Sequence, residues 1–433
     1  MKLRVLELFG GIGACSKALK RLRIDYEITD YVEIDKYAVK SFNAIHNTNF
    51  EPQDICEWDK DIEVDLIMHG SPCQDFSLAG KQAGGDIGSG TRSSLMYETI
   101  RIVGKLRPKY VIWENVKNLL SKKHRHNFDA YLETMEKLGY KNYYQVLNAK
   151  DYGIPQNRER VFTISVLGNG NYEFPPKQEL KLKLKNMLED EVDEKYYLSD
   201  TMINFFYKNE QVQKEKGNGF KFNVTDGNVI AKTITTRAGS RMDDNFLKIK
   251  EATKLGYKEA YEGDGVNISS RMKYQRGNVQ KESIQTITTS GGNERGVVVN
   301  DKPRVIGGVG EKKSNGGTQW YQQDRIYDNN VGLSLSTTAQ PYYPDKQLRI
   351  RKLTPKECWR LMGFDDKDFE KAKWYSKEET NKILGKQYPK NKSKKIFSKD
   401  GKLERMSDTQ LYKQAGNSIV VNVLEAILTN LLK

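Results

Sequence analysis

The sequence predicts an α/β protein with a doubly wound sheet and a smaller, mainly β second domain. Apolar runs of strand length alternate with segments of helical period over residues 1–166, the pattern of a doubly wound sheet. Residues 185–345 are polar and rich in Gly, Asn and Thr, which favours short strands and turns. Helical periodicity then returns. We therefore expect a first domain over 1–184, a second over 185–345, and a return to the first over 346–433.

Charge and cysteine usage narrow the function classes. The 433 residues carry a formal net charge of +14, typical of a protein that binds a polyanion such as nucleic acid. The cysteines, at positions 15, 56, 73 and 358, form no C-x-x-C pair, and the histidines lack ligand spacing. We expect no disulfide framework, no metal site and a reducing cytoplasm. We also expect no signal peptide and no membrane span, because the apolar runs are short.

The first predicted strand leads into a cofactor-type loop. A strand over 3–9 is followed by Gly10-Gly11-Ile12-Gly13 and a helix over 14–22, and such glycines let the backbone approach a ligand closely. A second strand ends at Glu33, which is placed to hydrogen-bond ribose hydroxyls. Asp54 adds a carboxylate in a later loop. Each acidic residue alone fits a surface charge, but together they favour an adenosine-containing cofactor.

A cysteine follows the third predicted strand. The apolar run 64–68 leads into Gly70-Ser71-Pro72-Cys73-Gln74-Asp75-Phe76-Ser77, and open α/β sheets place their ligands at such strand ends. Taken alone, Cys73 fits a buried apolar residue, the usual fate of a free cysteine. The stretch 80–90 holds five glycines and suits a mobile lid.

The next strands carry further charged side chains. A buried strand over 110–113 ends in Glu114-Asn115. A strand pair over 143–147 and 160–166 encloses Gln156-Asn157-Arg158-Glu159-Arg160. The plain alternatives are a solvated glutamate at a strand end and a basic surface turn.

The end of the chain is predicted to be helical. Helices are expected over 353–362, with Pro and Glu in the first turn, and over 411–432. Between them, residues 365–405 are rich in Lys and Asp. A solvated loop is the favoured interpretation of that stretch, with phosphate contact as the lesser one.

These blocks, in this order, resemble those of the DNA cytosine methyltransferases that modify carbon 5 of the ring. One block alone is weak, but the ordered set covers residues 3–166 and 347–427 and is highly specific. The matching blocks are Leu8-Phe9-Gly10-Gly11-Ile12-Gly13, Glu33 with Asp54, Pro72-Cys73-Gln74, Glu114-Asn115-Val116, Gln156-x-Arg158-x-Arg160, Arg351-x-Leu353-Thr354-Pro355-x-Glu357 and Gln414-x-Gly416-Asn417-Ser418.

The resemblance implies a mixed sheet of the S-adenosylmethionine-dependent methyltransferase type and methyl transfer to carbon 5 of cytosine in a specific double-stranded DNA sequence. Cys73 would attack carbon 6 of a flipped-out base, and a neutral Glu114 would stabilise the charge near ring nitrogen 3. Arg158 and Arg160 would orient that site. The implied S-adenosylmethionine contacts are Phe9, Gly11, Gly13, Glu33, Ile34, Asp54, Ile55, Pro72, Leu95 and Asn417. The implied substrate contacts are Gln74, Ser77, Gln156, Thr235 and Thr288.

The resemblance also assigns roles to the domains. Residues 1–184 would bind the cofactor and carry catalysis, and 185–345 would recognise neighbouring bases in the major groove. Residues 346–433 would return to the catalytic domain, with a basic insertion at about 365–405. Double-stranded DNA is the expected partner and a cognate restriction endonuclease a candidate one. We expect a cytoplasmic monomer, in a bacterium or a phage-infected cell, without metal or membrane.

Other functions compete with this one. The same blocks occur in cytosine methyltransferases that act on transfer RNA, although the Thr- and Asn-rich segment favours a DNA reader. A DNA-binding regulator without catalysis is opposed by the intact Cys73, Glu114 and Arg160. A nicotinamide-dependent oxidoreductase rests only on the glycine loop.

A short phrase recurs in the predicted second domain. It occurs at residues 232–236 (KTITT), 285–289 (QTITT) and 333–337 (LSLST), and the first two copies are 53 residues apart. The favoured interpretation is three similar strands of one reader, since Thr and Ile favour strands. The alternative is duplicated recognition modules, because some relatives in the family carry several readers.

Overall fold

The computed structural model describes residues 2–71, 95–250, 348–376 and 403–432, together with five short strands between 265 and 327. The chain divides into two compact units. The first comprises Met1–Val192, Glu210–Leu247 and Lys352–Lys433, and the second comprises Asp193–Asn209 and Lys248–Arg351. The first unit therefore includes residues on both sides of the predicted boundary at 184. The functional assignment of the segments stays a prediction.

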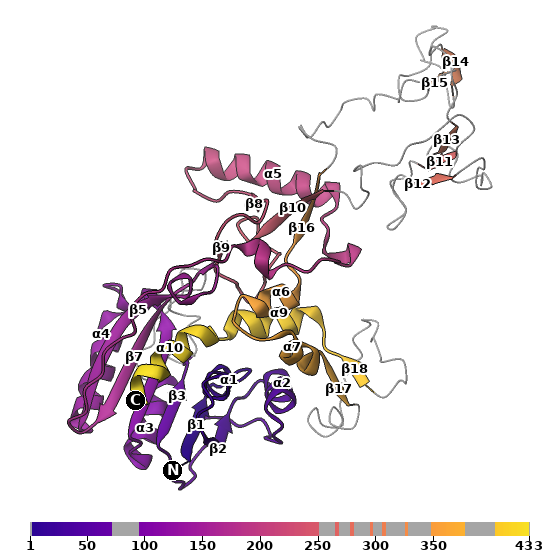
Figure 1. The fold of residues 1–433 in the computed structure, drawn as a ribbon. Helices are drawn as coiled ribbons and strands as arrows, with labels where there is room; N and C mark the ends of the chain where they lie inside the picture. Colours follow the sequence, from indigo (N-terminus) through magenta and orange to yellow (C-terminus); the bar gives the residue numbers. More distant parts are fainter. Residues whose placement is uncertain are drawn as a thin grey trace. The chain divides into compact units, whose positions relative to one another are not determined.

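The first unit is built on a six-stranded sheet with strand order β2-β1-β3-β4-β7-β5 (Figure 1). Its first four strands along the chain run parallel, and β7 is antiparallel to both β4 and β5. This arrangement confirms the predicted doubly wound, mixed sheet. The strands are β1 Leu3–Leu8, β2 Tyr26–Val32, β3 Leu66–His69, β4 Tyr110–Val116, β5 Tyr140–Asn148 and β7 Glu159–Leu167.

Helices cover the sheet with apolar side chains. One core joins the sheet to α3 (Met96–Leu106) and α4 (Arg125–Lys137), where the Trp113 and Tyr131 rings lie 4.2 Å apart. The helix α1 (Ala14–Arg21) packs beside α10 (Val421–Leu431), although they are about as far apart in sequence as the chain allows (Figure 1). A helix near the start of the chain and the last helix therefore pack together within the first unit.

Further helices and short strands complete the first unit. They are α2 Lys36–His46, η2 Lys117–Leu120, η3 Ala149–Tyr152, β6 Gln156–Asn157, η4 Leu184–Met187, β8 Val224–Thr225, β9 Ala231–Lys232, α6 Pro355–Arg360, α7 Asp366–Lys373, β17 Trp374–Ser376, β18 Leu403–Arg405 and α9 Asp408–Asn417. Three elements have residues in both units: α5 Asp200–Glu215, β10 Phe246–Lys250 and β16 Leu348–Lys352.

The second unit holds short β structure. An antiparallel sheet has the order β12-β11-β13, and β14 pairs with β15. These elements are η5 Glu194–Tyr196, β11 Gly265–Asn267, β12 Asn278–Gln280, β13 Arg295–Val297, β14 Val305–Gly308 and β15 Arg325–Tyr327. Short strands were predicted for this part of the chain.

Three helical features differ from the prediction. The stretch 365–405 was expected to be a solvated loop, but its start forms the helix α7, which buries Phe369 and Ala372. The helix α5 was not expected, because its buried apolar positions are only Ile203 and Phe206 while the neighbouring Phe205 is 59% exposed, so the helical period is weak. The single helix expected over 411–432 is interrupted between α9 and α10, where Ser418 is extended. The interruption has a specific partner, Arg158, described below.

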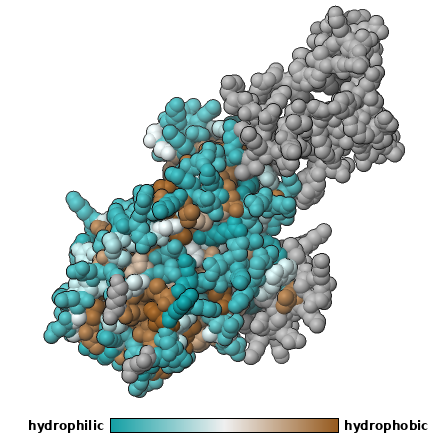
Figure 2. Space-filling model, viewed as in Figure 1, coloured by the Kyte–Doolittle hydropathy of each residue, from teal (hydrophilic) through white to brown (hydrophobic). Residues whose placement is uncertain are grey.

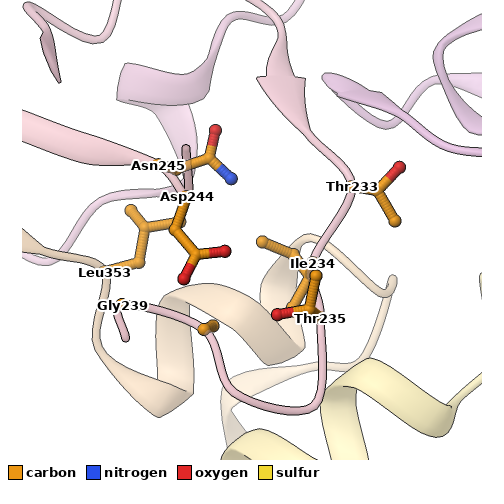
Figure 3. A pocket seen from close by; sticks show the side chains of 8 residues that line it. Thr233, Ile234, Thr235, Gly239, Asp244, Asn245 and Leu353 are labelled. Carbon is orange, nitrogen blue, oxygen red and sulfur yellow. The ribbon is translucent and has the colours of Figure 1, made fainter. Parts of the chain in front are cut away.

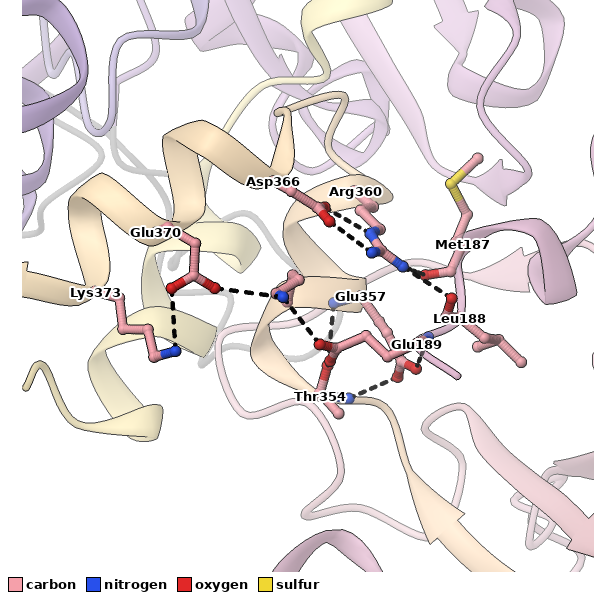
Figure 4. Close-up of polar contacts among 10 residues, drawn as sticks. Met187, Leu188, Glu189, Thr354, Glu357, Arg360, Asp366, Glu370 and Lys373 are labelled. Atoms are coloured by element: carbon pink, nitrogen blue, oxygen red, sulfur yellow. Dashed lines mark hydrogen bonds and ion pairs between the residues drawn. The ribbon is translucent and has the colours of Figure 1, made fainter. Parts of the chain in front are cut away.

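A polar network at the start of α6 joins this helix to residues 187–189 (Figure 4). Thr354 and Glu357 form a capping box, in which each side chain accepts a hydrogen bond from the other residue's main chain. Glu357 also accepts from the Glu189 N–H at 2.9 Å, and Arg360 donates to the carbonyls of residues 187 and 188. The segments on either side of residues 190–350 are thus held together within the first unit.

The surface is largely hydrophilic on the face that Figure 2 shows, with apolar patches between the polar residues. In the part of the chain that the structure describes, no helix is long and apolar enough to span a membrane. The same described residues contain no group of three or more His, Cys, Asp or Glu side chains that could hold a metal ion.

Candidate active site

Three of the predicted site residues that the structure describes lie at one edge of the sheet, together with Ser71. Phe9 follows β1, Glu33 follows β2, Ser71 lies two residues after β3, and Glu114 lies near the end of β4. Because these strands are parallel, their carboxyl ends meet at the same edge. In the sheet, β2 lies on the outer side of β1 and β4 on the outer side of β3, so the strand order reverses between β1 and β3. Open α/β sheets bind ligands at such a switch point.

The loop after β1 has an unusual backbone. Gly11 and Gly13 have φ values of 56° and 79°, and Phe9, which is not a glycine, has a φ of 53°. A Cβ added at Gly13 would lie 2.3 Å from His46 Nε2, so a larger residue does not fit there. Left-handed backbone at a non-glycine residue is uncommon and clusters at functional sites.

Glu33 organises the second part of this loop region. Its carboxylate accepts hydrogen bonds from the N–H groups of Gly11, at 3.1 Å, and Asp35, at 2.8 Å. Burial raises the pKa of Glu33, and these two N–H donors oppose that rise. The Gln53 N–H donates to the Glu33 carbonyl at 3.0 Å, which brings the loop carrying Asp54 alongside.

Apolar side chains flank these carboxylates. Phe9, Ile55 and Leu95 belong to one hydrophobic cluster, in which Ile55 is buried and the other two are half-buried. Ile34 is 68% exposed, a large apolar side chain without cover at the end of β2. An aromatic ring or another flat apolar ligand group could pack on such a surface.

The last sequence block reaches the same region. Lys413 Nζ lies 2.6 Å from the Asp35 carboxylate, and Gln414 donates to the Tyr37 carbonyl at 2.9 Å. Asn417 is the last residue of the same helix, α9, and is exposed. The helix that carries Asn417 therefore lies against the loop that follows Glu33.

Glu114 and Arg160 form an ion pair at the end of β4. Glu114 is 9% exposed, and Arg160 Nε lies 3.0 Å from Glu114 Oε1. Burial raises the pKa of the Glu114 carboxyl, while Arg160 and then Arg158 oppose the rise. A Cβ added at Gly70 would lie 3.6 Å from Glu114 Oε2, so the end of β3 lies beside this carboxyl.

Ser71 fixes the start of the segment that carries Cys73. Its hydroxyl oxygen accepts hydrogen bonds from the Trp113 indole N–H at 3.1 Å and from the Asn115 amide at 3.3 Å. Both donors belong to β4, the strand that carries Glu114. The sequence pattern does not indicate this role for Ser71 or Asn115, although both lie within the matched blocks or next to them.

Arg158 and Gln156 hold main-chain atoms from distant segments. Arg158 donates to the carbonyls of Ile234 at 3.0 Å, Gly416 at 3.0 Å and Ser418 at 2.9 Å. Gln156 accepts from the Ile234 N–H at 2.9 Å. In a continuous helix the Gly416 and Ser418 carbonyls would accept hydrogen bonds from main-chain N–H groups, but here they accept from Arg158. This explains the break between α9 and α10.

Several predicted site residues lie outside the described residues. They are Pro72, Cys73, Gln74, Ser77 and Thr288, together with the glycine-rich stretch 80–90 and the later copies of the recurring phrase. Thr235 is described and half-buried, and a Cβ added at Gly416 would lie 2.5 Å from its carbonyl carbon. The catalytic, cofactor and substrate roles of all the predicted residues stay predictions.

The chain is similar to proteins of one enzyme family. The model of the C-5 cytosine-specific DNA methylase family matches residues 3–400. The orphan methyltransferase M.SPRI of Bacillus phage SPR is 30% identical, over 100% of this chain and 98% of its own. The type II methyltransferase M2.ScrFI of Lactococcus lactis subsp. cremoris is 29% identical, over 100% and 99%. The crystal structure of S. pombe Dnmt2 methyltransferase shares the fold, with a TM-score of 0.54 and 16% identity over 100% of this chain and 98% of that one.

Proposed function

The chain belongs to the C-5 cytosine-specific DNA methylase family and is a DNA cytosine-5 methyltransferase, and on that premise we propose that Cys73 is its nucleophile and Glu114 its acid. Cys73 attacks carbon 6 of a flipped-out cytosine, which turns carbon 5 into an enamine-like nucleophile. Loss of the carbon-5 proton and release of the thiolate end the turnover.

The pairing of Glu114 with Arg160 is the observation that supports this proposal most strongly. A buried carboxyl with a raised pKa can hold a proton and donate it to ring nitrogen 3. Arg160 holds the carboxyl in one place from the facing strand. Ser71, two residues before Cys73, is bonded to Trp113 and Asn115 on the strand of Glu114.

The residues at the ends of β1 and β2 fit S-adenosylmethionine. Glu33 offers a fixed carboxylate for ribose hydroxyls, and the exposed Ile34 and half-buried Phe9 offer apolar surface for adenine. Asp54 lies in the adjoining loop for the adenine amine. When bound, the cofactor supplies the methyl group, and these side chains position it at the edge of the sheet where Glu114 lies.

Double-stranded DNA is the proposed substrate, with the transfer RNA alternative not favoured. The basic composition and the match to a DNA methylase family both support DNA. Labelled cofactor should transfer methyl groups to duplex DNA and not to transfer RNA. Transfer to RNA alone would overturn the proposal.

We also propose that the segment 185–345 chooses the DNA sequence and that the enzyme acts as a monomer, with a cognate restriction endonuclease as a candidate partner. Bisulfite sequencing of DNA from cells that express the protein would give the methylated words. Thr235→Ala and Thr288→Ala should damage one common activity if the segment is a single reader. Loss of a different word in each variant would show separate modules.

A further inference from the structure

We propose that Arg158 is a positioning residue that fixes the main chain beside Asn417 and beside Thr235 at the same time, and so holds one residue for the cofactor and one for the DNA in fixed relative positions. The inference rests on the proposed function, with Asn417 as a contact of S-adenosylmethionine and Thr235 as a contact of DNA. It gives Arg158 a role in the binding of both ligands and not in the reaction at the base.

On the cofactor side, Arg158 holds both neighbours of Asn417. Its Nη2 atom donates to the Gly416 carbonyl at 3.0 Å and to the Ser418 carbonyl at 2.9 Å. Asn417 lies between these two residues at the end of α9, with its side chain exposed. The two hydrogen bonds therefore fix the main chain on both sides of Asn417, which limits the directions that its exposed side chain can take.

On the DNA side, the same guanidinium holds the residue before Thr235. Arg158 Nη1 donates to the Ile234 carbonyl at 3.0 Å, and the Ile234 N–H donates to Gln156 at 2.9 Å. The Ile234 side chain is 1% exposed and lines a pocket with Leu353 (Figure 3). Both polar groups and the side chain of Ile234 are thus fixed, and the half-buried Thr235 follows directly.

The link between the two sides is short and rigid. A Cβ added at Gly416 would lie 2.3 Å from Thr236 N, so the two held segments touch. Arg158 is 3% exposed, its N–H donates to Asn148 at 3.1 Å, and its carbonyl accepts from the Ala149 N–H at 3.1 Å. An arginine presents its donors in one rigid plane, whereas a lysine has a single ammonium group that cannot reproduce this geometry.

Arg160 and Arg158 differ in their relation to the catalytic carboxyl. Arg160 is the arginine that pairs with Glu114, at 3.0 Å. Burial raises the pKa of Glu114, and the charge of Arg160 and then that of Arg158 oppose the rise. A lysine at position 158 would keep this positive charge and lose only the planar arrangement of donors. Arg158→Lys therefore separates the positioning role from an effect on Glu114.

The test compares binding with catalysis in Arg158→Lys. Calorimetry without DNA measures the affinity for S-adenosylmethionine, and fluorescence anisotropy without cofactor measures the affinity for a duplex that the wild type methylates. Both affinities should fall at least about fivefold, the scale of one misplaced polar contact. Single-turnover methyl transfer should fall at low ligand concentrations, and saturation with both ligands should restore it to within about threefold of the wild type.

Two further variants complete the design. Arg160→Lys is the matched control and should show the opposite split, with the saturated rate reduced at least about tenfold. Gly416→Ala displaces the same main chain without changing Arg158, so it should weaken both affinities even if Arg158→Lys does not fold.

Three results would overturn the inference: normal affinities in the folded variants, loss of affinity for one ligand alone, or a saturated rate in Arg158→Lys as low as in Arg160→Lys. A wild type that neither binds S-adenosylmethionine nor methylates DNA would instead overturn the proposed function, and this inference with it.

Discussion

The Arg160 guanidinium lies 3.0 Å from the Glu114 carboxylate across the antiparallel β4–β7 pair, with Glu114 almost fully buried. The two effects on the carboxyl oppose each other, because burial raises its pKa and the arginine lowers it. An acid balanced in this way can exchange a proton with a bound ring and stay in one position. This pair is therefore the first place to test the chemistry.

Glu114→Gln should keep the fold and abolish most of the methyl transfer. The amide has nearly the same shape but cannot donate and recover a proton, and general acid catalysis typically contributes about 10²- to 10⁴-fold. Single-turnover transfer of labelled methyl groups should fall within that range, with little change in DNA binding. The control is Glu159→Gln on the neighbouring strand, where Glu159 pairs with the exposed Lys117. Equal rates for the two variants would remove Glu114 from the mechanism.

Glu33→Ala should weaken cofactor binding. Glu33 is fixed by the N–H groups of Gly11 and Asp35, so its carboxylate is ready to accept ribose hydroxyls. Hydrogen bonds to a charged group are worth about 1.5–3 kcal/mol, which sets the expected loss of affinity. Titration calorimetry with S-adenosylmethionine measures it. Glu27→Ala, in the strand β2 that leads to Glu33 but paired at the surface with Lys2, should bind normally. Normal binding by the Glu33 variant as well would refute the role.

Glu7 should make stability fall as pH rises. Burial raises its pKa from 4.5 to about 7, and Ser16 donates to it from both its N–H and its hydroxyl. The folded state therefore prefers the protonated carboxyl, and that stability is present below about pH 4.5 and lost as pH rises through about 7. Each pKa unit is worth about 1.4 kcal/mol, so the loss is on the order of 3 kcal/mol.

Glu7→Gln isolates this effect, because the amide oxygen still accepts from Ser16 but does not ionise. Urea unfolding at pH 5 and pH 8 should show a clearly smaller loss of unfolding free energy in the variant than in the wild type. The same pH dependence in both proteins would assign it to other groups.

Gly416→Ala should disturb the contact between α9 and the first copy of the phrase. The added carbon would lie 2.3 Å from Thr236 N, and one side must move. Overpacking of this kind typically costs about 1–3 kcal/mol of unfolding free energy. Gly104→Ala is the matched helical control, since its added carbon meets only Leu138 at ordinary contact distance. Thermal unfolding should separate the two variants, and equal stabilities would mean that the contact carries no energy.

The sheet and its loops could be predicted from the sequence because their signals are local. Buried runs and glycine turns predict β1, β3 and β4, and the acidic residue at the end of β2 follows from the spacing to the glycine loop. The resemblance then placed Glu114 and Arg160 in one site, and the structure brings these two side chains together.

Long-range contacts could not be predicted in the same way. The break in the C-terminal helix depends on Arg158, more than 250 residues away in sequence. The link between Lys413 and Asp35 joins the last block to the cofactor loop through a contact that no local pattern indicates. The helix α5 was missed because its exposed Phe205 hides the helical period.

Cys73 is the proposed nucleophile, and trapping its covalent bond to the target base is the direct test of that role. Duplex DNA that carries 5-fluorocytosine at the target should trap the enzyme, because fluorine cannot leave as the carbon-5 proton does. The wild type and Cys56→Ala, which removes a different cysteine that is exposed in the structure, should both give a DNA complex that survives a denaturing gel. Cys73→Ala should give none while still binding DNA. A trapped complex with Cys73→Ala would contradict the assignment of the nucleophile.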